Sequence, residues 1–272
     1  MRRAKWAGMK TSEAVLLLHC SGSSSAQWRS LAAKLGERYR VLTPDLIGYG
    51  ANAPWAGNWA FCLADEAAPL RALVGRLGEP VHLVGHSYGG GVALHLARTR
   101  PEFFQSLTLI EPSAFHLLRD GDTADAAALA EITGVAVQAK VALANGDYLA
   151  GIGRFVDYWS GPGAWEAMAP ERRAAFAPQL AKIALEFNAL FHEPVAAEDL
   201  RGIALPTLLL QGARTRLPSR CVVKRLREVL PNHEFKLVEG AGHMLPITHR
   251  DAVDALVAAH LAAHPRERRE AA

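Results

Sequence analysis

Ser87 is the residue of this 272-residue chain whose neighbours most clearly predict chemistry. It stands in the stretch Gly85-His86-Ser87-Tyr88-Gly89, between an apolar run and a helix-like segment. Glycines two positions before and after a serine allow a sharp strand-to-helix turn that holds its hydroxyl clear of the backbone. The same turn places the backbone N–H of Tyr88 at a helix N-terminus, where it can stabilise developing negative charge. The pattern predicts a nucleophilic serine with one oxyanion donor beside it.

Further stretches around this serine resemble the α/β-hydrolase fold family. They are residues 19–25, residues 45–50 and the Gly-Ala-Gly-His stretch 240–243. The resemblance covers nearly the whole chain and implies a serine–acid–histidine order. It also implies that His243 is the general base and that the backbone N–H of Ser21 is the second oxyanion donor. Cys20 departs from this pattern, because the family usually has glycine at that position.

The acid of this triad is expected away from its usual place in the family. That place lies three residues after the glycine that ends the penultimate strand, and here it holds Thr215, three residues after Gly212. Threonine cannot stabilise an imidazolium as a carboxylate does. Some members of the family carry the acid at the end of the neighbouring strand, where this chain has Glu111. We therefore expect Glu111 to be the acid, with Asp199 and Glu198 as weaker candidates and a degraded site as the remaining alternative.

Short apolar runs alternate with helix-length segments and predict the sheet that must position these residues. The expected strands are residues 14–19, 39–43, 81–85, 106–111, 206–211 and 233–238. The expected helices are residues 26–35, 62–77, 88–98, 219–230 and 248–263, the last with Thr248 as its N-cap. This alternation predicts an α/β fold in which a mostly parallel central sheet has helices on both faces.

Residues 113–200 interrupt the alternation, because they contain alanine-rich helical pattern and no buried-strand run. We interpret them as a helical cap inserted into a hydrolase core made of residues 1–112 and 201–272. Most aromatic residues of the insertion are expected to form its own small core. They are Phe115, Tyr148, Phe155, Tyr158, Trp159, Trp165, Phe176, Phe187 and Phe191.

The composition excludes several classes of protein. Half of the residues are hydrophobic and the formal net charge is +3, which excludes a disordered chain. There is no continuous apolar run of 18 residues, so no membrane-spanning helix is expected. No basic patch with aromatic support predicts a nucleic-acid partner, and no residue spacing predicts a metal or a cofactor. Three cysteines without a CxxC pair fit a reducing compartment, which places the protein in the cytoplasm.

These observations predict a serine hydrolase that acts through an acyl-enzyme on a small, largely apolar carboxylic ester or related acyl compound. Its only expected partner is that small-molecule substrate, and the oligomeric state is left open. Two alternatives on the same fold are a carbon–carbon bond hydrolase and a cofactor-free dioxygenase. A third is an inactive ligand-binding relative, because Thr215 stands at the usual position of the acid.

Overall fold

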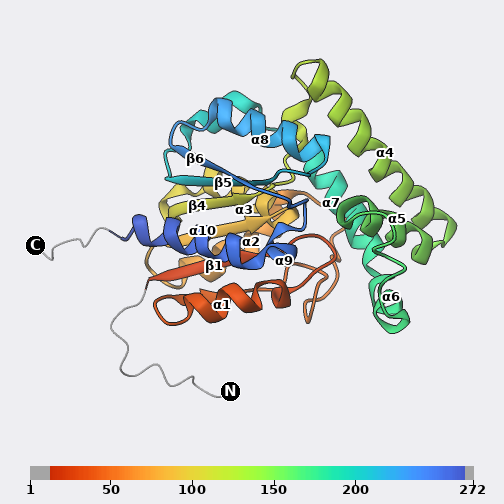
Figure 1. The fold of residues 1–272 in the computed structure, drawn as a ribbon, viewed down its shortest axis with the longest axis horizontal. Helices are drawn as coiled ribbons and strands as arrows, with labels where there is room; N and C mark the ends of the chain where they lie inside the picture. Colours follow the sequence, from red (N-terminus) through yellow and green to blue (C-terminus); the bar gives the residue numbers. More distant parts are fainter. Residues whose placement is uncertain (1–12, 267–272) are drawn as a thin grey trace, which may run out of the picture.

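A six-stranded sheet lies at the centre of the computed structural model, which describes residues 13–266 (Figure 1). Its strands are β1 (Ala14–Leu18), β2 (Arg40–Leu42), β3 (Val81–His86), β4 (Phe104–Ile110), β5 (Thr207–Gly212) and β6 (His233–Val238). Their order across the sheet is β2-β1-β3-β4-β5-β6, and neighbouring strands are parallel. The predicted α/β class is confirmed, and each expected strand is found within two residues of its predicted ends.

Helices cover both faces of this sheet because successive strand side chains point to opposite sides. These helices are α1 (Arg29–Leu35), α2 (Leu63–Gly75), α3 (Tyr88–Thr99), α8 (Leu217–Val229) and α10 (Arg250–Ala263). Val15 and Leu17 of β1 pack in one cluster with α1 and α10, whereas Leu16 and Leu18 pack in another with α2, α3 and α8. Burial on both faces explains why the central strands β1, β3, β4 and β5 are largely apolar, whereas the edge strands β2 and β6 are only partly buried.

Residues 113–200, here called the helical segment, connect β4 to β5. The segment contains the short 3₁₀ helix η3 (Phe115–Leu118) and the helices α4 (Thr123–Asn145), α5 (Tyr148–Ser160), α6 (Pro170–Phe176) and α7 (Gln179–Phe191). A further 3₁₀ helix, η4 (Ala197–Gly202), leads from it to β5. Figure 1 shows α4 to α7 gathered at one end of the sheet rather than on its faces. The domain boundaries at either end of the segment stay a prediction.

Helix α4 bears on the expectation that no helix of this protein crosses a membrane. Its 23 residues are long and apolar enough, by length and composition alone, to cross a membrane. The most apolar stretch of 18 residues has a mean hydropathy of 1.4, although Glu131 and Lys140 interrupt it. One such helix is weak evidence for a membrane span. Glu131 accepts a hydrogen bond from the Tyr158 hydroxyl of α5, so this polar residue is bound within the protein.

The expected start of the last helix is wrong. Thr248 is not its N-cap but the final residue of a separate turn, α9 (Leu245–Thr248), and α10 begins at Arg250. Pro246 lies in the first turn of α9, where its fixed φ and missing N–H favour helix initiation. The Thr248 hydroxyl donates to the Met244 carbonyl four residues earlier, as serine and threonine do inside a helical turn.

The turn from β3 into α3 is packed against the end of β1 without room for side chains. A Cβ on Gly85 would lie 2.3 Å from the Gly89 carbonyl oxygen, and a Cβ on Gly89 would lie 2.4 Å from the Leu18 carbonyl oxygen. Both distances are too short for real contacts, and the groups met are backbone that cannot rotate away. The two glycines are therefore required by the close approach of three chain segments.

We expect Gly89→Ala to lower the free energy of unfolding by about 1–3 kcal/mol, because the new methyl group overpacks against backbone. Gly134→Ala is the matched control, since a Cβ there meets nothing within 4 Å in the middle of α4. It should raise stability by roughly 0.5–1 kcal/mol through helix propensity. Urea unfolding of both variants measures the difference, and equal stability of the two would contradict the packing argument.

Candidate active site

The register of three parallel strands brings distant residues to one edge of the sheet. His86 pairs with Ile110 across β3 and β4, so Ser87 and Glu111 follow neighbouring strand ends. The Ser87 N–H donates to the Ile110 carbonyl at 3.0 Å. The carboxyl edge of a parallel sheet is where α/β folds place their sites.

Ser87, His243 and Glu111 form one continuous line of hydrogen bonds. His243 Nε2 lies 2.9 Å from Ser87 Oγ, and His243 Nδ1 lies 2.7 Å from Glu111 Oε2. All three side chains are buried. Ser87 has φ 53° and Glu111 has φ 41°, and these are the non-glycine residues with positive φ in the described chain. Such backbone strain costs on the order of 1–3 kcal/mol at each residue and is found most often at functional sites.

The Glu111 carboxylate is held by donors at the end of the neighbouring strand β5 and in the loop that follows it. Its Oε1 accepts the Gly212 N–H at 2.7 Å, and its Oε2 accepts the Thr215 hydroxyl at 2.5 Å. Thr215, which stands at the usual position of the acid, therefore contributes a hydrogen bond to the carboxylate. The other candidates lie elsewhere: Asp199 accepts the Ala196 N–H, and Glu198 pairs with Arg201.

The two backbone N–H groups expected in the oxyanion hole lie on segments that meet beside Ser87. Tyr88 is the first residue of α3, so its N–H has no acceptor within the helix. Ser21 lines the same cavity as Ser87. Cys20, the departure from the family pattern, has a buried thiol, and burial raises its pKa to about 12. A thiol with so high a pKa is protonated at neutral pH and unreactive as a nucleophile.

A chain of hydrogen bonds that the sequence did not predict links residues 19–25, here called the oxyanion loop, to His243. Gln27 Oε1 accepts the Cys20 N–H at 3.0 Å, and Gln27 Nε2 lies 3.1 Å from His86 Nδ1. His86 Nε2 donates to the His243 carbonyl at 2.9 Å. This bond requires the proton on Nε2, so Nδ1 must accept from Gln27. No motif marks Gln27, because its partners lie 7 and 59 residues away.

Trp159 of α5 also departs from expectation. Rather than only filling the core of the helical segment, its ring lies over the His243 imidazole, with 4.0 Å between centroids and a tilt of 33°. Trp159 is 8% exposed, and it lines both cavities that contain Ser87. The indole therefore shields the histidine from bulk water on that side.

Ser87 lies between two cavities of different size. The larger is a cleft of about 900 Å³ that extends past the oxyanion loop and is also lined by His243 and Met244. The smaller is an inner pocket whose walls are mostly apolar, with Phe115 and Phe187 among them. Within residues 13–266, no cluster of three or more histidine, cysteine, aspartate or glutamate side chains could hold a metal ion.

The His86 network predicts the protonation state of that ring. Burial, with a smaller contribution from His243, lowers the pKa of His86 well below its usual value. The ring should therefore stay neutral, with its proton on Nε2, as the pH falls through 6.5. Histidine ¹⁵N NMR between pH 8 and 5.5 tests this expectation.

As the pH falls, the His86 ring takes up a second proton near pH 6.5 in the unfolded chain but not in the folded chain. The free energy of unfolding therefore decreases on acidification. Gln27→Leu is the control variant: it should move the Nδ1 resonance of His86 and leave the proton on Nε2. A His86 ring that titrates near pH 6.5 would contradict the assignment.

Comparisons with known proteins agree with this fold. The family model described as alpha/beta hydrolase fold matches residues 13–250. A pimeloyl-[acyl-carrier protein] methyl ester esterase of Aeromonas hydrophila is 31% identical over 86% of this chain and 90% of its own length. Among solved structures, MenH from S. aureus (22% identity, TM-score 0.73) covers 95% of this chain, with 96% of its own chain matched. A meta-cleavage product hydrolase from Pseudomonas fluorescens (17% identity, TM-score 0.64) covers 93% of this chain, with 92% of its own matched. The chain therefore belongs to the α/β-hydrolase fold family and is a hydrolase.

Proposed function

We propose that the protein is a serine hydrolase that cleaves small, largely apolar carboxylic esters through an acyl-enzyme. The observation that carries the proposal is the line of hydrogen bonds from Ser87 Oγ through both ring nitrogens of His243 to Glu111. A hydroxyl, an imidazole and a carboxylate in this arrangement make a serine nucleophilic at neutral pH.

In the first half of the reaction, Ser87 Oγ attacks the ester carbonyl carbon while His243 Nε2 takes the hydroxyl proton. The carbonyl oxygen becomes an oxyanion, which the N–H groups of Tyr88 and Ser21 stabilise. Glu111 holds the imidazolium in orientation through Nδ1. The carbon–oxygen bond to the alcohol then breaks, and His243 gives its proton to the leaving oxygen.

In the second half, water attacks the acyl carbon of the ester on Ser87. His243 takes one proton from this water and returns it to Ser87 Oγ as the bond from carbon to serine breaks. The carboxylic acid leaves, and the enzyme is restored. We propose that the helical segment acts as a cap in both halves, because Trp159 and Phe155 of α5 line the cleft beside Ser87. An enclosed site strengthens the electrostatic interactions of the oxyanion and the imidazolium.

The relatives favour an ester substrate over the substrates of the alternative activities, a carbon–carbon bond hydrolase or a cofactor-free dioxygenase. The curated relative from Aeromonas hydrophila is named for the hydrolysis of a methyl ester, and it matches this chain over most of both lengths. The likeness to meta-cleavage product hydrolases, at 17% identity, supports only the shared fold. An inactive binding protein is less consistent with the site, since Glu111 lies where it can replace the carboxylate absent at Thr215.

A fluorophosphonate probe tests the nucleophile. We expect it to label the wild-type protein on Ser87 and to leave Ser87→Ala unlabelled, because only an activated serine attacks phosphorus at a useful rate. Mass spectrometry of the labelled peptide identifies the site. Folded wild-type protein that takes up no label would refute the proposed mechanism.

The acid is tested by Glu111→Gln, which keeps the shape of the side chain and removes its charge. We expect kcat to fall on the order of 10³- to 10⁴-fold, because the amide no longer stabilises the imidazolium or the correct tautomer. Asp199→Asn is the matched control and should change kcat by less than about twofold. Hydrolysis of p-nitrophenyl esters of increasing chain length gives the rates, and equal losses in the two variants would exclude Glu111 as the acid.

A further inference from the structure

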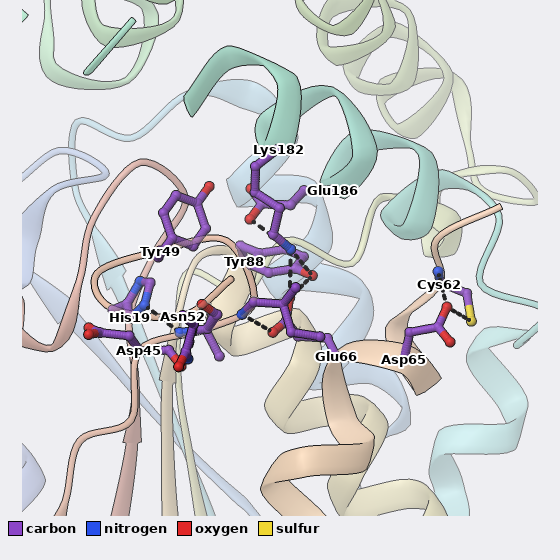
Figure 2. Close-up of polar contacts among 12 residues, drawn as sticks. His19, Asp45, Tyr49, Asn52, Cys62, Asp65, Glu66, Tyr88, Lys182 and Glu186 are labelled. Carbon is purple, nitrogen blue, oxygen red and sulfur yellow. Dashed lines mark hydrogen bonds and ion pairs between the residues drawn. The ribbon is translucent and has the colours of Figure 1, made fainter. Parts of the chain in front are cut away.

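A lysine of the helical segment, Lys182, is buried beside Tyr88 and Glu66 (Figure 2). Lys182 Nζ of α7 lies 2.6 Å from Glu66 Oε2 of α2, and the Tyr88 hydroxyl donates to the same oxygen at 2.8 Å. The ammonium also lies 4.1 Å from the centre of the Phe61 ring and 4.9 Å from that of Tyr88. The charge of Lys182 is therefore already balanced by Glu66.

A second carboxyl group next to this pair has only a long ion-pair contact and no hydrogen-bond partner. Glu186, one turn further along α7, is 1% exposed, and neither of its oxygens makes a hydrogen bond within the described chain. Its nearest cation is Lys182, with 3.6 Å between Nζ and Oε1. Ser21 and Tyr49 lie close enough to favour its charged form, although neither makes a hydrogen bond of good geometry to it.

This arrangement is costly for a protein interior. Transfer of a carboxylate from water without a hydrogen-bonding partner costs several kcal/mol, so such groups are normally paired. Burial raises the pKa of Glu186 to about 7, with Glu66 adding to the rise and Lys182 opposing it. A buried carboxyl group that lacks a hydrogen bond and lies in the wall of an active site is a candidate for binding a polar group of the substrate.

Glu186 lines the smaller, inner pocket rather than the larger cleft. That pocket also contains Ser87 and Ser21, and its remaining walls are mostly aromatic and aliphatic. His243, which gives a proton to the leaving alcohol in the proposed reaction, lines the cleft. The alcohol part must therefore face the cleft, and the acyl part of the substrate is directed to the inner pocket and to Glu186.

We propose that Glu186 forms a polar acyl subsite, which accepts a hydrogen bond from a hydroxyl group carried on the acyl chain near the scissile carbonyl. This inference rests on the proposed function and narrows its substrate class to short hydroxyacyl esters. The free space of the pocket is about 10 Å³, close to what one water-sized group needs. A hydroxyl meets both requirements, because it is small and it donates the hydrogen bond that the carboxylate lacks.

Two pairs of methyl esters test this subsite. Within each pair, one ester carries a hydroxyl group where the other carries a methyl group of similar size. The pairs are methyl glycolate with methyl propionate, and methyl 3-hydroxypropionate with methyl butyrate. The quantity measured is the ratio of kcat/KM within each pair, for the wild type and for Glu186→Leu. Dividing the wild-type ratio by the variant ratio cancels the intrinsic reactivity of the esters. We expect this quotient, measured at a pH above the pKa of Glu186, to be roughly 10 to 100 in at least one pair, which is the factor expected from one hydrogen bond to a charged acceptor.

Two further variants separate recognition from folding. Glu186→Gln keeps an accepting oxygen and should retain part of the hydroxyl preference. Glu193→Gln is the matched control, since Glu193 is also buried but accepts a hydrogen bond from His95 and does not line the inner pocket. It should leave the ratio unchanged. Because Glu186→Leu removes a buried carboxyl group that makes no hydrogen bond and leaves the Lys182–Glu66 pair intact, its Tm should not fall below that of the wild type.

The outcomes distinguish the subsite from the proposed function. If the wild type hydrolyses methyl propionate but has the same hydroxyl ratios as Glu186→Leu, the subsite is refuted and the serine hydrolase is not. If the wild type hydrolyses none of the four esters, the subsite is refuted, and the fluorophosphonate experiment decides separately whether Ser87 is a nucleophile.

Discussion

The parallel register of β3, β4 and β5 is the constraint on which the site depends. It sets His86 opposite Ile110 and Ile110 opposite Leu210, so the three strands end at one edge. Hydrogen bonds from the Ser87 N–H to the Ile110 carbonyl and from the Glu111 N–H to the Leu210 carbonyl continue the ladder past the strand ends. A shift by one residue would turn every side chain to the opposite face and separate Ser87 from His243.

The same register explains how the carboxylate can occupy β4 instead of β5. Neighbouring strands lie about 4.8 Å apart, so a glutamate at one strand end and a shorter acid at the next can reach the same imidazole. Glu111 crosses toward β5, where the Gly212 N–H and the Thr215 hydroxyl both donate to it. The position that usually holds the acid thus keeps a polar role as a donor to the relocated carboxylate.

Buried polar contacts join the helical segment to the core. Lys182 of α7 reaches Glu66, which also accepts from the hydroxyl of Tyr88, the residue after the candidate nucleophile (Figure 2). Trp159 of α5 lies against His243 on another side of the site. Breaking a buried pair such as Lys182–Glu66 leaves an uncompensated charge, so these contacts fix where the segment sits over the sheet.

The sequence alone determined the features that depend on neighbours along the chain. Apolar runs and helix-length segments located all six strands, and the glycines around Ser87 predicted the tight turn that β3 and α3 form. Resemblance to the family, rather than the residues by themselves, pointed to Glu111 and His243, which the structure brings within hydrogen-bonding distance. These features follow from local propensity and from periodic burial, which a single sequence records.

Tertiary structure alone decided the contacts between residues far apart in the chain. Three features have no local signature: the link through Gln27, the position of Trp159 over His243, and the Glu186 carboxyl group without a hydrogen bond. The helix start predicted at Thr248 is wrong because the chain is already helical from Leu245 to Thr248. Burial and hydrogen-bond pairing arise only when separate segments pack together, and that packing gives these side chains their chemical environment.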